Sequence, residues 1–185
     1  MADRNVYIFL ADGFEDIEGL TVVDLMRRAG IRIQTVSITK TKKITTSHGI
    51  EMFTDITMDE ADFADADMLV LPGGMPGTKY LGSCEPLLAL LKEHYNNEGK
   101  IAAICAAPTV LSSLGFLKGR KATCYPSMMS QLDCREAVED SVVVDGNITT
   151  SRGLGTALPF ALSLIAQLLS DEKAEEIAAS VVYRD

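Results

Sequence analysis

Short runs of apolar residues alternate along the chain with longer stretches in which apolar residues repeat at helical spacing. The short runs predict strands over residues 6–11, 32–38, 68–71 and 101–104. A strand pair within residues 44–57 and a hairpin around Asp145 add the remaining strands. The longer stretches predict helices over residues 17–29, 86–96, 108–114, 156–169 and 171–182.

Most of these strands are too apolar to keep one face in water, and helices separate them along the chain. This alternation is typical of a parallel sheet that helices cover on both faces. The sequence therefore predicts a flavodoxin-like three-layer α/β/α sandwich with a mostly parallel sheet. We find no internal repeat and no linker rich in glycine, serine or proline, so we expect residues 1–185 to form a single domain.

Composition and charge narrow the classes of function. Of the 185 residues, 47% are hydrophobic, and the formal net charge is −9. An acidic protein is unsuited to nucleic acid or an anionic membrane as its main partner, although a local arginine can still hold a small anionic substrate. The first apolar run is short and acidic residues follow it, which predicts neither a signal peptide nor a membrane span and favours a cytoplasmic protein.

The cysteines form no metal-binding pattern. They are Cys84, Cys105, Cys124 and Cys134. No two of them make a C-x-x-C pair, and the chain has only two histidines, so we predict free thiols, no metal and no cofactor. Three of the four are assigned to packing or to the surface, and Cys105 is the exception.

Four loops follow predicted strands and carry unusual residues. They span residues 12–15, 72–77, 105–108 and 152–155. In an open parallel sheet, sites form beyond the carboxyl ends of the strands. If the predicted sheet is right, the four loops meet on one rim.

Cys105 carries the sharpest signal on that rim. Small residues surround it, and Pro108 suits the first position of a helix. The thiol would then sit at a helix N-terminus, where the dipole and unpaired N–H groups lower a thiol pKa. The alternative is that Cys105 is a small buried hydrophobic residue, the usual fate of a free cysteine.

Glycines and an arginine on the rim suit an anion. Gly73 and Gly74 could supply N–H donors to an oxyanion beside the sulfur, or could simply form a tight turn. Arg152 could bind a substrate carboxylate with two hydrogen bonds, or could pair with a surface acid.

Glu18 is the candidate acid–base group. Stabilisation of the helix dipole explains Glu15 and Asp16 at the start of the first helix. Glu18 differs because apolar and small neighbours would desolvate it and raise its pKa, so that it could shuttle a proton. The dipole remains the alternative for Glu18 as well.

Together these residues resemble the ThiJ/PfpI superfamily, close to its parkinsonism-associated deglycase and glyoxalase III-like branch. The resemblance runs from Val6 to about Val182. The matching segments are Glu18 with residues 24–30, then residues 71–74, 102–108 and 150–153. Four such segments in the same order make the match specific and favour a reactive Cys105.

The resemblance implies a homodimer of flavodoxin-like subunits with the cysteine at a strained nucleophile elbow. It implies that Cys105 is the nucleophile and oxidation site, and that Glu18 is its protonated hydrogen-bond partner. The N–H groups of Gly74 and Ala106 would line the oxyanion pocket. No metal or organic cofactor is implied.

The sequence departs from its relatives at two positions. Relatives often have a histidine after the elbow helix, where this chain has Tyr125. They often have an arginine where His48 stands, near the partner subunit's pocket. We therefore expect proton transfer to depend on Glu18, with a contribution of His48 across a dimer interface as an open alternative.

The implied activities are glutathione-independent conversion of methylglyoxal-type 2-oxoaldehydes to hydroxy acids, removal of early glycation adducts, and a stress-protective role. A non-enzymatic redox sensor oxidised at Cys105 is the main alternative. A cysteine peptidase or amidotransferase is less favoured, because such enzymes need an imidazole to activate the thiol.

Overall fold

A computed structural model describes residues 4–183. The central sheet contains seven strands: β1 (Asn5–Leu10), β2 (Arg32–Ser37), β5 (Ile56–Thr57), β6 (Met68–Leu71), β7 (Lys100–Ile104), β10 (Val142–Asp145) and β11 (Ile148–Ser151). Two small sheets pair β3 (Lys43–Thr45) with β4 (Glu51–Phe53) and β8 (Lys121–Ala122) with β9 (Glu136–Ala137). The α-helices are α1 (Asp16–Arg28), α2 (Gly77–Ser83), α3 (Glu85–Asn96), α4 (Pro108–Ser113), α5 (Ala157–Leu168) and α6 (Asp171–Ser180).

The strand order of the central sheet is β10-β11-β7-β6-β1-β2-β5. Every neighbouring pair is parallel except β10 with β11, which form an antiparallel hairpin at one edge. The five central strands follow the doubly wound order of flavodoxin-like folds. The switch point, where the strand order reverses along the sheet, lies between the parallel strands β1 and β6. The predicted fold class is confirmed.

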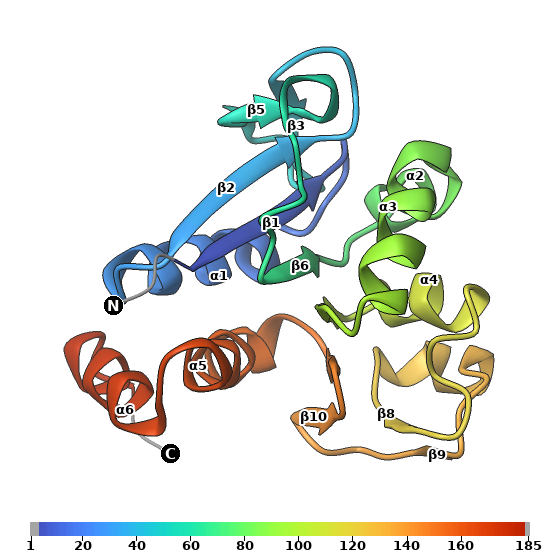
Figure 1. The fold of residues 1–185 in the computed structure, drawn as a ribbon, viewed down its shortest axis with the longest axis vertical. Coiled ribbons are helices and arrows are strands. Elements are labelled where there is room, and N and C mark those ends of the chain that lie inside the picture. The colour runs from blue at the N-terminus through green and yellow to red at the C-terminus, as the bar shows by residue number, and fades with distance from the viewer. Residues whose placement is uncertain (1–3, 184–185) are drawn as a thin grey trace.

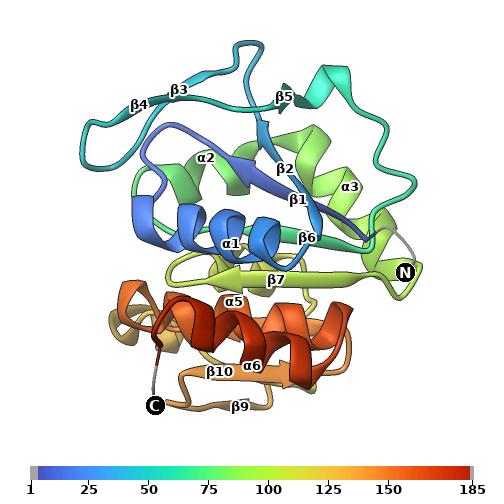
Figure 2. The same ribbon diagram turned by 90° about the vertical axis from the view of Figure 1, so that its left-hand side faces the viewer.

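Helices cover both faces of the sheet, as Figure 1 shows, with α1, α5 and α6 on one side and α2, α3 and α4 on the other. Figure 2 shows α5 and α6 in front of the sheet beside α1. In β1, Val6 and Ile8 belong to the first apolar core, whereas Tyr7 and Phe9 belong to the second. Successive side chains of a strand point to opposite faces, so a continuous apolar run supplies two cores at once.

The sequence predicted most elements within a few residues of their observed bounds. It missed α2 and the small β8–β9 sheet, which are too short to show a periodic pattern. It also missed the 3-10 turn η3 (Leu154–Thr156), which precedes α5, while α5 itself lies within the predicted helix over residues 156–169. Within residues 4–183, no helix combines the length and the apolar character needed to cross a membrane.

Phe160 provides a test of this packing. It lies on α5 and is 0% exposed within the first core. Phe160→Ala should lower the free energy of unfolding by about 3–5 kcal/mol, because it leaves a cavity between α5 and the sheet. Urea unfolding followed by circular dichroism measures this. Val144→Ala on β10, where the side chain is 49% exposed, is the control and should change stability by no more than about 0.5 kcal/mol.

Candidate active site

Backbone hydrogen bonds join the four loops at the carboxyl edge of the sheet. The Glu15 N–H donates to the Gly73 carbonyl oxygen at 2.9 Å, which joins the first loop to the second. The Cys105 N–H donates to the Ser151 carbonyl oxygen at 3.0 Å, which joins the third loop to the end of β11, where the fourth loop begins. The predicted meeting of these loops on one rim is confirmed.

Cys105 stands on a left-handed turn between β7 and α4. Its φ is +65°, a region that residues with a side chain rarely adopt and that costs about 1–2 kcal/mol. Its carbonyl oxygen accepts a hydrogen bond of 2.8 Å from the Tyr125 N–H. Both backbone groups of Cys105 are therefore bonded, which holds the unfavourable turn in place.

Glu18 lies in the first turn of α1 and is 1% exposed. Glu15 caps the helix, because its carboxylate accepts a hydrogen bond of 2.8 Å from the Glu18 N–H. This bond holds the backbone of Glu18, from which its carboxyl extends, in place. One of its oxygens, Oε2, accepts the Gly73 N–H at 3.1 Å, and Glu18 also shares a hydrogen bond with Cys105. The predicted dipole role is confirmed for Glu15, and Glu18 instead faces the thiol.

Gly73 allows this close approach. A Cβ on Gly73 would lie 2.5 Å from the Cβ of Cys105 and 2.5 Å from Oε2 of Glu18, which is closer than such atoms can pack. Only glycine fits between the two side chains. Because the Gly73 N–H is bonded to Glu18, the donors that face the sulfur are the N–H groups of Gly74 and Ala106.

Burial raises the pKa of Glu18 to about 7, and the negative charge of Glu15 acts in the same direction. Hydrogen bonds from Cys105 and from the N–H groups of Gly73 and Leu154 lower it, but less than burial raises it. The predicted direction of this shift is confirmed. Near neutral pH, both the protonated and the charged form of Glu18 are therefore populated.

The predicted lowering of the Cys105 pKa is wrong. Burial raises the pKa of the thiol to about 12, and the charge of Glu18 adds to the rise. The N–H groups of Gly74 and Ala106 lower it only partly, and α4 has just six residues to provide a dipole. A thiolate therefore depends on Glu18 holding the proton, so the two groups act as one acid with a shared proton.

Arg152 is directed toward Glu139. Its Nη1 donates to the Glu139 carbonyl oxygen at 3.1 Å and lies 3.9 Å from a carboxylate oxygen of the same residue. Of the two alternatives for Arg152, this arrangement favours pairing with an acid. Binding of a substrate carboxylate stays a prediction.

His48 lies in the turn between β3 and β4 and pairs with Asp16 through Nδ1. Hydrogen bonding to Asp16 raises the pKa of the imidazole. Among residues 4–183, Glu15, Asp16 and His48 form the one group of three whose ligand atoms lie within 4.8 Å of one another. The ion pair already joins two of them. A contribution of His48 to a partner subunit's site stays a prediction.

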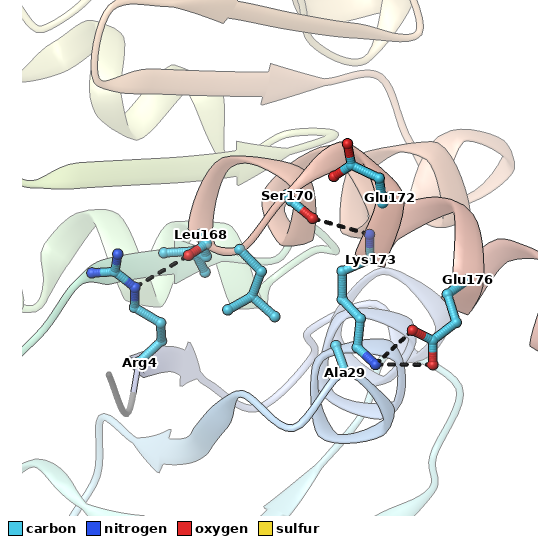
Figure 3. A pocket seen from close by; sticks show the side chains of 8 residues that line it. Arg4, Ala29, Leu168, Ser170, Glu172, Lys173 and Glu176 are labelled. Carbon is cyan, nitrogen blue, oxygen red and sulfur yellow. Dashed lines mark hydrogen bonds and ion pairs between the residues drawn. The ribbon is translucent and has the colours of Figure 1, made fainter. Parts of the chain in front are cut away.

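A separate surface cavity of about 570 Å³ lies at the opposite edge of the sheet. Arg4, Ala29 and Lys173 line it together with the end of α5 and the start of α6 (Figure 3). Arg4 bonds the Leu168 carbonyl oxygen and Asp67, and Lys173 bonds Glu176, so both cations are already paired. This cavity lacks the groups needed for thiol chemistry.

The sequence profile of the DJ-1/PfpI family matches residues 4–167. The chain belongs to the DJ-1/PfpI family. Protein DJ-1 homolog B of Arabidopsis thaliana is 39% identical over 184 residues, which are 98% of this chain and 42% of that protein. The glutathione-independent glyoxalase DJR-1.2 of Caenorhabditis elegans is 30% identical over 179 residues, 95% of each chain.

Solved DJ-1 structures share the fold. Oxidized Toxoplasma gondii DJ-1 superposes with a TM-score of 0.95 at 36% identity, over 98% of this chain and 100% of that one. This DJ-1/PfpI chain spans 42% and 47% of the lengths of two Arabidopsis thaliana relatives, DJ-1 homologs B and A, and nearly all of DJR-1.2.

Two residues of this DJ-1/PfpI site lie in the predicted loop of residues 152–155, but the sequence assigned them no role. Gly153 lies beside the carboxyl of Glu18, and the Leu154 N–H donates a hydrogen bond to that carboxyl. A glycine two residues after a strand that ends on the rim is the available signal.

The burial of Glu18 predicts a pH-dependent stability. Its folded pKa of about 7 lies above the ordinary value of 4.5, so the folded protein keeps a proton that the unfolded chain releases. This contribution is fully present below pH 4.5 and is lost as the pH rises through 7. As the pH rises between those limits, the free energy of unfolding of wild type should fall by up to about 3 kcal/mol relative to that of Glu18→Gln.

Urea unfolding of both proteins at pH 4.5 and at pH 8 measures this shift. Asp24→Asn removes a more exposed carboxylate from the same helix and gives the baseline. A difference between wild type and Glu18→Gln that is the same at both pH values would contradict the raised pKa of Glu18.

Proposed function

We propose that this protein is a cysteine-dependent, glutathione-independent glyoxalase and deglycase that acts on methylglyoxal-type 2-oxoaldehydes or their early glycation adducts. The observation that carries the proposal is the position of the Cys105 thiol. It lies between a carboxyl group that titrates near neutral pH and two N–H donors, those of Gly74 and Ala106. The glyoxalase DJR-1.2, a relative over nearly its whole length, supports the same chemistry.

The first step is addition of the thiol to the aldehyde carbon. As the sulfur–carbon bond forms, the aldehyde oxygen becomes an oxyanion, and the thiol proton passes to Glu18. The N–H groups of Gly74 and Ala106 stabilise the oxyanion. Glu18 then returns the proton to this oxygen, which completes the hemithioacetal and restores the carboxylate.

Glu18 then moves a proton between adjacent carbons. Its carboxylate removes the hydrogen on the first carbon to give an enediol, and returns a proton to the second carbon. The first carbon is thereby oxidised to a thioester and the second is reduced from a ketone to an alcohol, so no external oxidant is needed. Water cleaves the sulfur–carbon bond, which releases the hydroxy acid and restores the thiol.

The proposal is tested by following methylglyoxal and lactate without glutathione in wild type, Cys105→Ala and Glu18→Gln. Lactate formation should fall to background in Cys105→Ala, which lacks the nucleophile. It should fall about 10²–10⁴-fold in Glu18→Gln, which keeps the shape of the side chain but cannot shuttle a proton. Wild-type lactate production no higher than that of Cys105→Ala would rule out the proposed activity.

A redox sensor is the second candidate. Oxidation of Cys105 by two molecules of a hydroperoxide, through the sulfenic acid, would give a sulfinate, whose oxygens could accept hydrogen bonds from Gly74, Ala106 and protonated Glu18. The high pKa of the thiol disfavours fast oxidation while Glu18 is charged. The peptidase alternative finds less support, because His48 pairs with Asp16 and His94 bonds the Lys100 carbonyl oxygen at the far end of β7.

We also propose that the protein forms a homodimer, stays in the cytoplasm and protects against carbonyl stress. The location and the protective role rest on resemblance. The dimer has structural support, because Ile17 and Leu20 on α1 and Phe53 on β4 are large apolar side chains exposed to solvent. The turn next to β4 is joined to the loop that leads into α1 through a hydrogen bond between the Ser47 N–H and the Phe14 carbonyl oxygen.

Phe53, which is 74% exposed, tests the dimer. Phe53→Asp should raise the dimer dissociation constant at least about 10-fold, because it places a charge in an apolar interface. Sedimentation equilibrium measures this constant, with Tyr80→Asp on α2 as the control for adding a charge to an exposed aromatic position. A wild-type protein that stays monomeric at micromolar concentration would contradict the dimer.

A further inference from the structure

The loop that follows β11 reaches Glu18 with its backbone. The Leu154 N–H donates a hydrogen bond to the Glu18 carboxyl, and Gly153 lies beside that carboxyl. Arg152, the charged residue of the loop, is directed toward Glu139. The loop therefore acts on Glu18 through the position of its backbone, which depends on what holds the loop in place.

Thr156 holds this loop through its side chain. Its Oγ1 accepts the Arg152 N–H at 3.2 Å and the Gly153 N–H at 3.1 Å. Its own N–H donates to the Gly153 carbonyl oxygen at 2.8 Å and closes the turn. Leu154 lies within this turn, so the bonds of Thr156 fix the segment that carries the Leu154 N–H.

Thr156 occupies the N-cap position of α5, yet its hydroxyl does not cap that helix. An N-cap threonine ordinarily accepts an N–H from the second or third residue of its own helix. Here the side chain turns back and bonds the preceding loop instead. The hydroxyl of Thr156 therefore orders the loop and not the helix.

The hydroxyl proton of Thr156 has a defined direction. A hydroxyl has one proton and two lone pairs, and the two N–H groups of the loop occupy both lone pairs. The proton can go to Ser151 Oγ at 2.7 Å, or to the Gly153 carbonyl oxygen at 2.9 Å, which already accepts the Thr156 N–H. Ser151 Oγ in turn donates to the Ser141 carbonyl oxygen at 2.7 Å. Donation from Thr156 to Ser151 thus joins the loop to the open end of the β10–β11 hairpin.

We propose that Thr156 is a positioning residue, whose hydroxyl orders the loop so that the Leu154 N–H stays on the Glu18 carboxyl and stabilises its charged form. The hydrogen bond from Leu154 lowers the pKa of this carboxyl, against the effect of burial. The titratable groups that face Glu18 are the Cys105 thiol after β7 and the Glu15 carboxylate before α1. The effect on turnover rests on the proposed function, in which charged Glu18 takes the thiol proton, whereas the effect on the carboxyl does not.

The test removes the hydroxyl and keeps the shape of the side chain, in Thr156→Val. The pH at which Glu18 loses its proton is measured by infrared spectroscopy, from the protonated-carboxyl band that Glu18→Gln lacks. Thr156→Ser restores the hydroxyl. Thr149→Val is the matched control, because it removes a buried threonine hydroxyl of β11 that bonds Gln167 on α5 instead of the loop. Urea midpoints show that each variant is folded.

In Thr156→Val the pH midpoint of Glu18 should rise by about one unit, because the charged form loses a hydrogen-bond donor. The midpoint should stay within about 0.3 unit of wild type in Thr156→Ser and Thr149→Val. From a wild-type pKa of about 7, this rise lowers the charged fraction at pH 7 from about one half to about one tenth. The kcat/KM for lactate formation from methylglyoxal should therefore fall about 5-fold at pH 7 and recover to within about 2-fold of wild type at pH 9.

An unchanged Glu18 midpoint in Thr156→Val would overturn the role of Thr156. This holds whether kcat/KM stays as in wild type or falls equally at pH 7 and pH 9, as a merely structural change would produce. Thr156→Ala, which also removes the hydroxyl, should shift the midpoint in the same direction and serves if the valine variant does not fold. If the midpoint shifts but wild type forms no lactate, the role of Thr156 stands and the proposed function fails.

Discussion

The close approach of Glu18 to Cys105 across Gly73 is the contact on which the rest of the site depends. A carboxyl and a thiol that share a hydrogen bond in a buried place cannot both be charged without a large cost. Each group therefore sets the protonation of the other. The reactivity of the sulfur therefore depends on which of the two groups carries the proton. Backbone N–H groups, rather than a histidine, stabilise the charged forms.

The sheet holds this pair from two directions. Glu18 comes from the helix after β1, and Cys105 from the turn after β7, with β6 lying between these two strands. The loop after β6 supplies the glycine that separates the two side chains. Because the strands are parallel, three segments distant in sequence end on one edge, and their apolar packing on both faces fixes the spacing between them.

The sequence predicts this fold and the members of the pair well, because apolar runs and helix boundaries are local signals. Cys105 and the glycine loop are predicted from their positions after strands, and Glu18 from its apolar and small neighbours at the start of a helix. The pKa of Cys105 was predicted in the wrong direction, since a helix N-terminus is visible in sequence but the burial of the sulfur beside a charged carboxylate is not. The partner of Arg152 also depends on tertiary contacts that no local pattern encodes.

The hydrogen bonds between the loops have a consequence for protein engineering. Gly13, Gly74 and Gly77 pack backbone against backbone, so the first two loops fit together at one length only. Insertions there would separate Glu18 from the sulfur before they unfolded the protein. By contrast, the segment between β9 and β10 lies at the sheet edge with exposed residues, where a change of chain length is better tolerated.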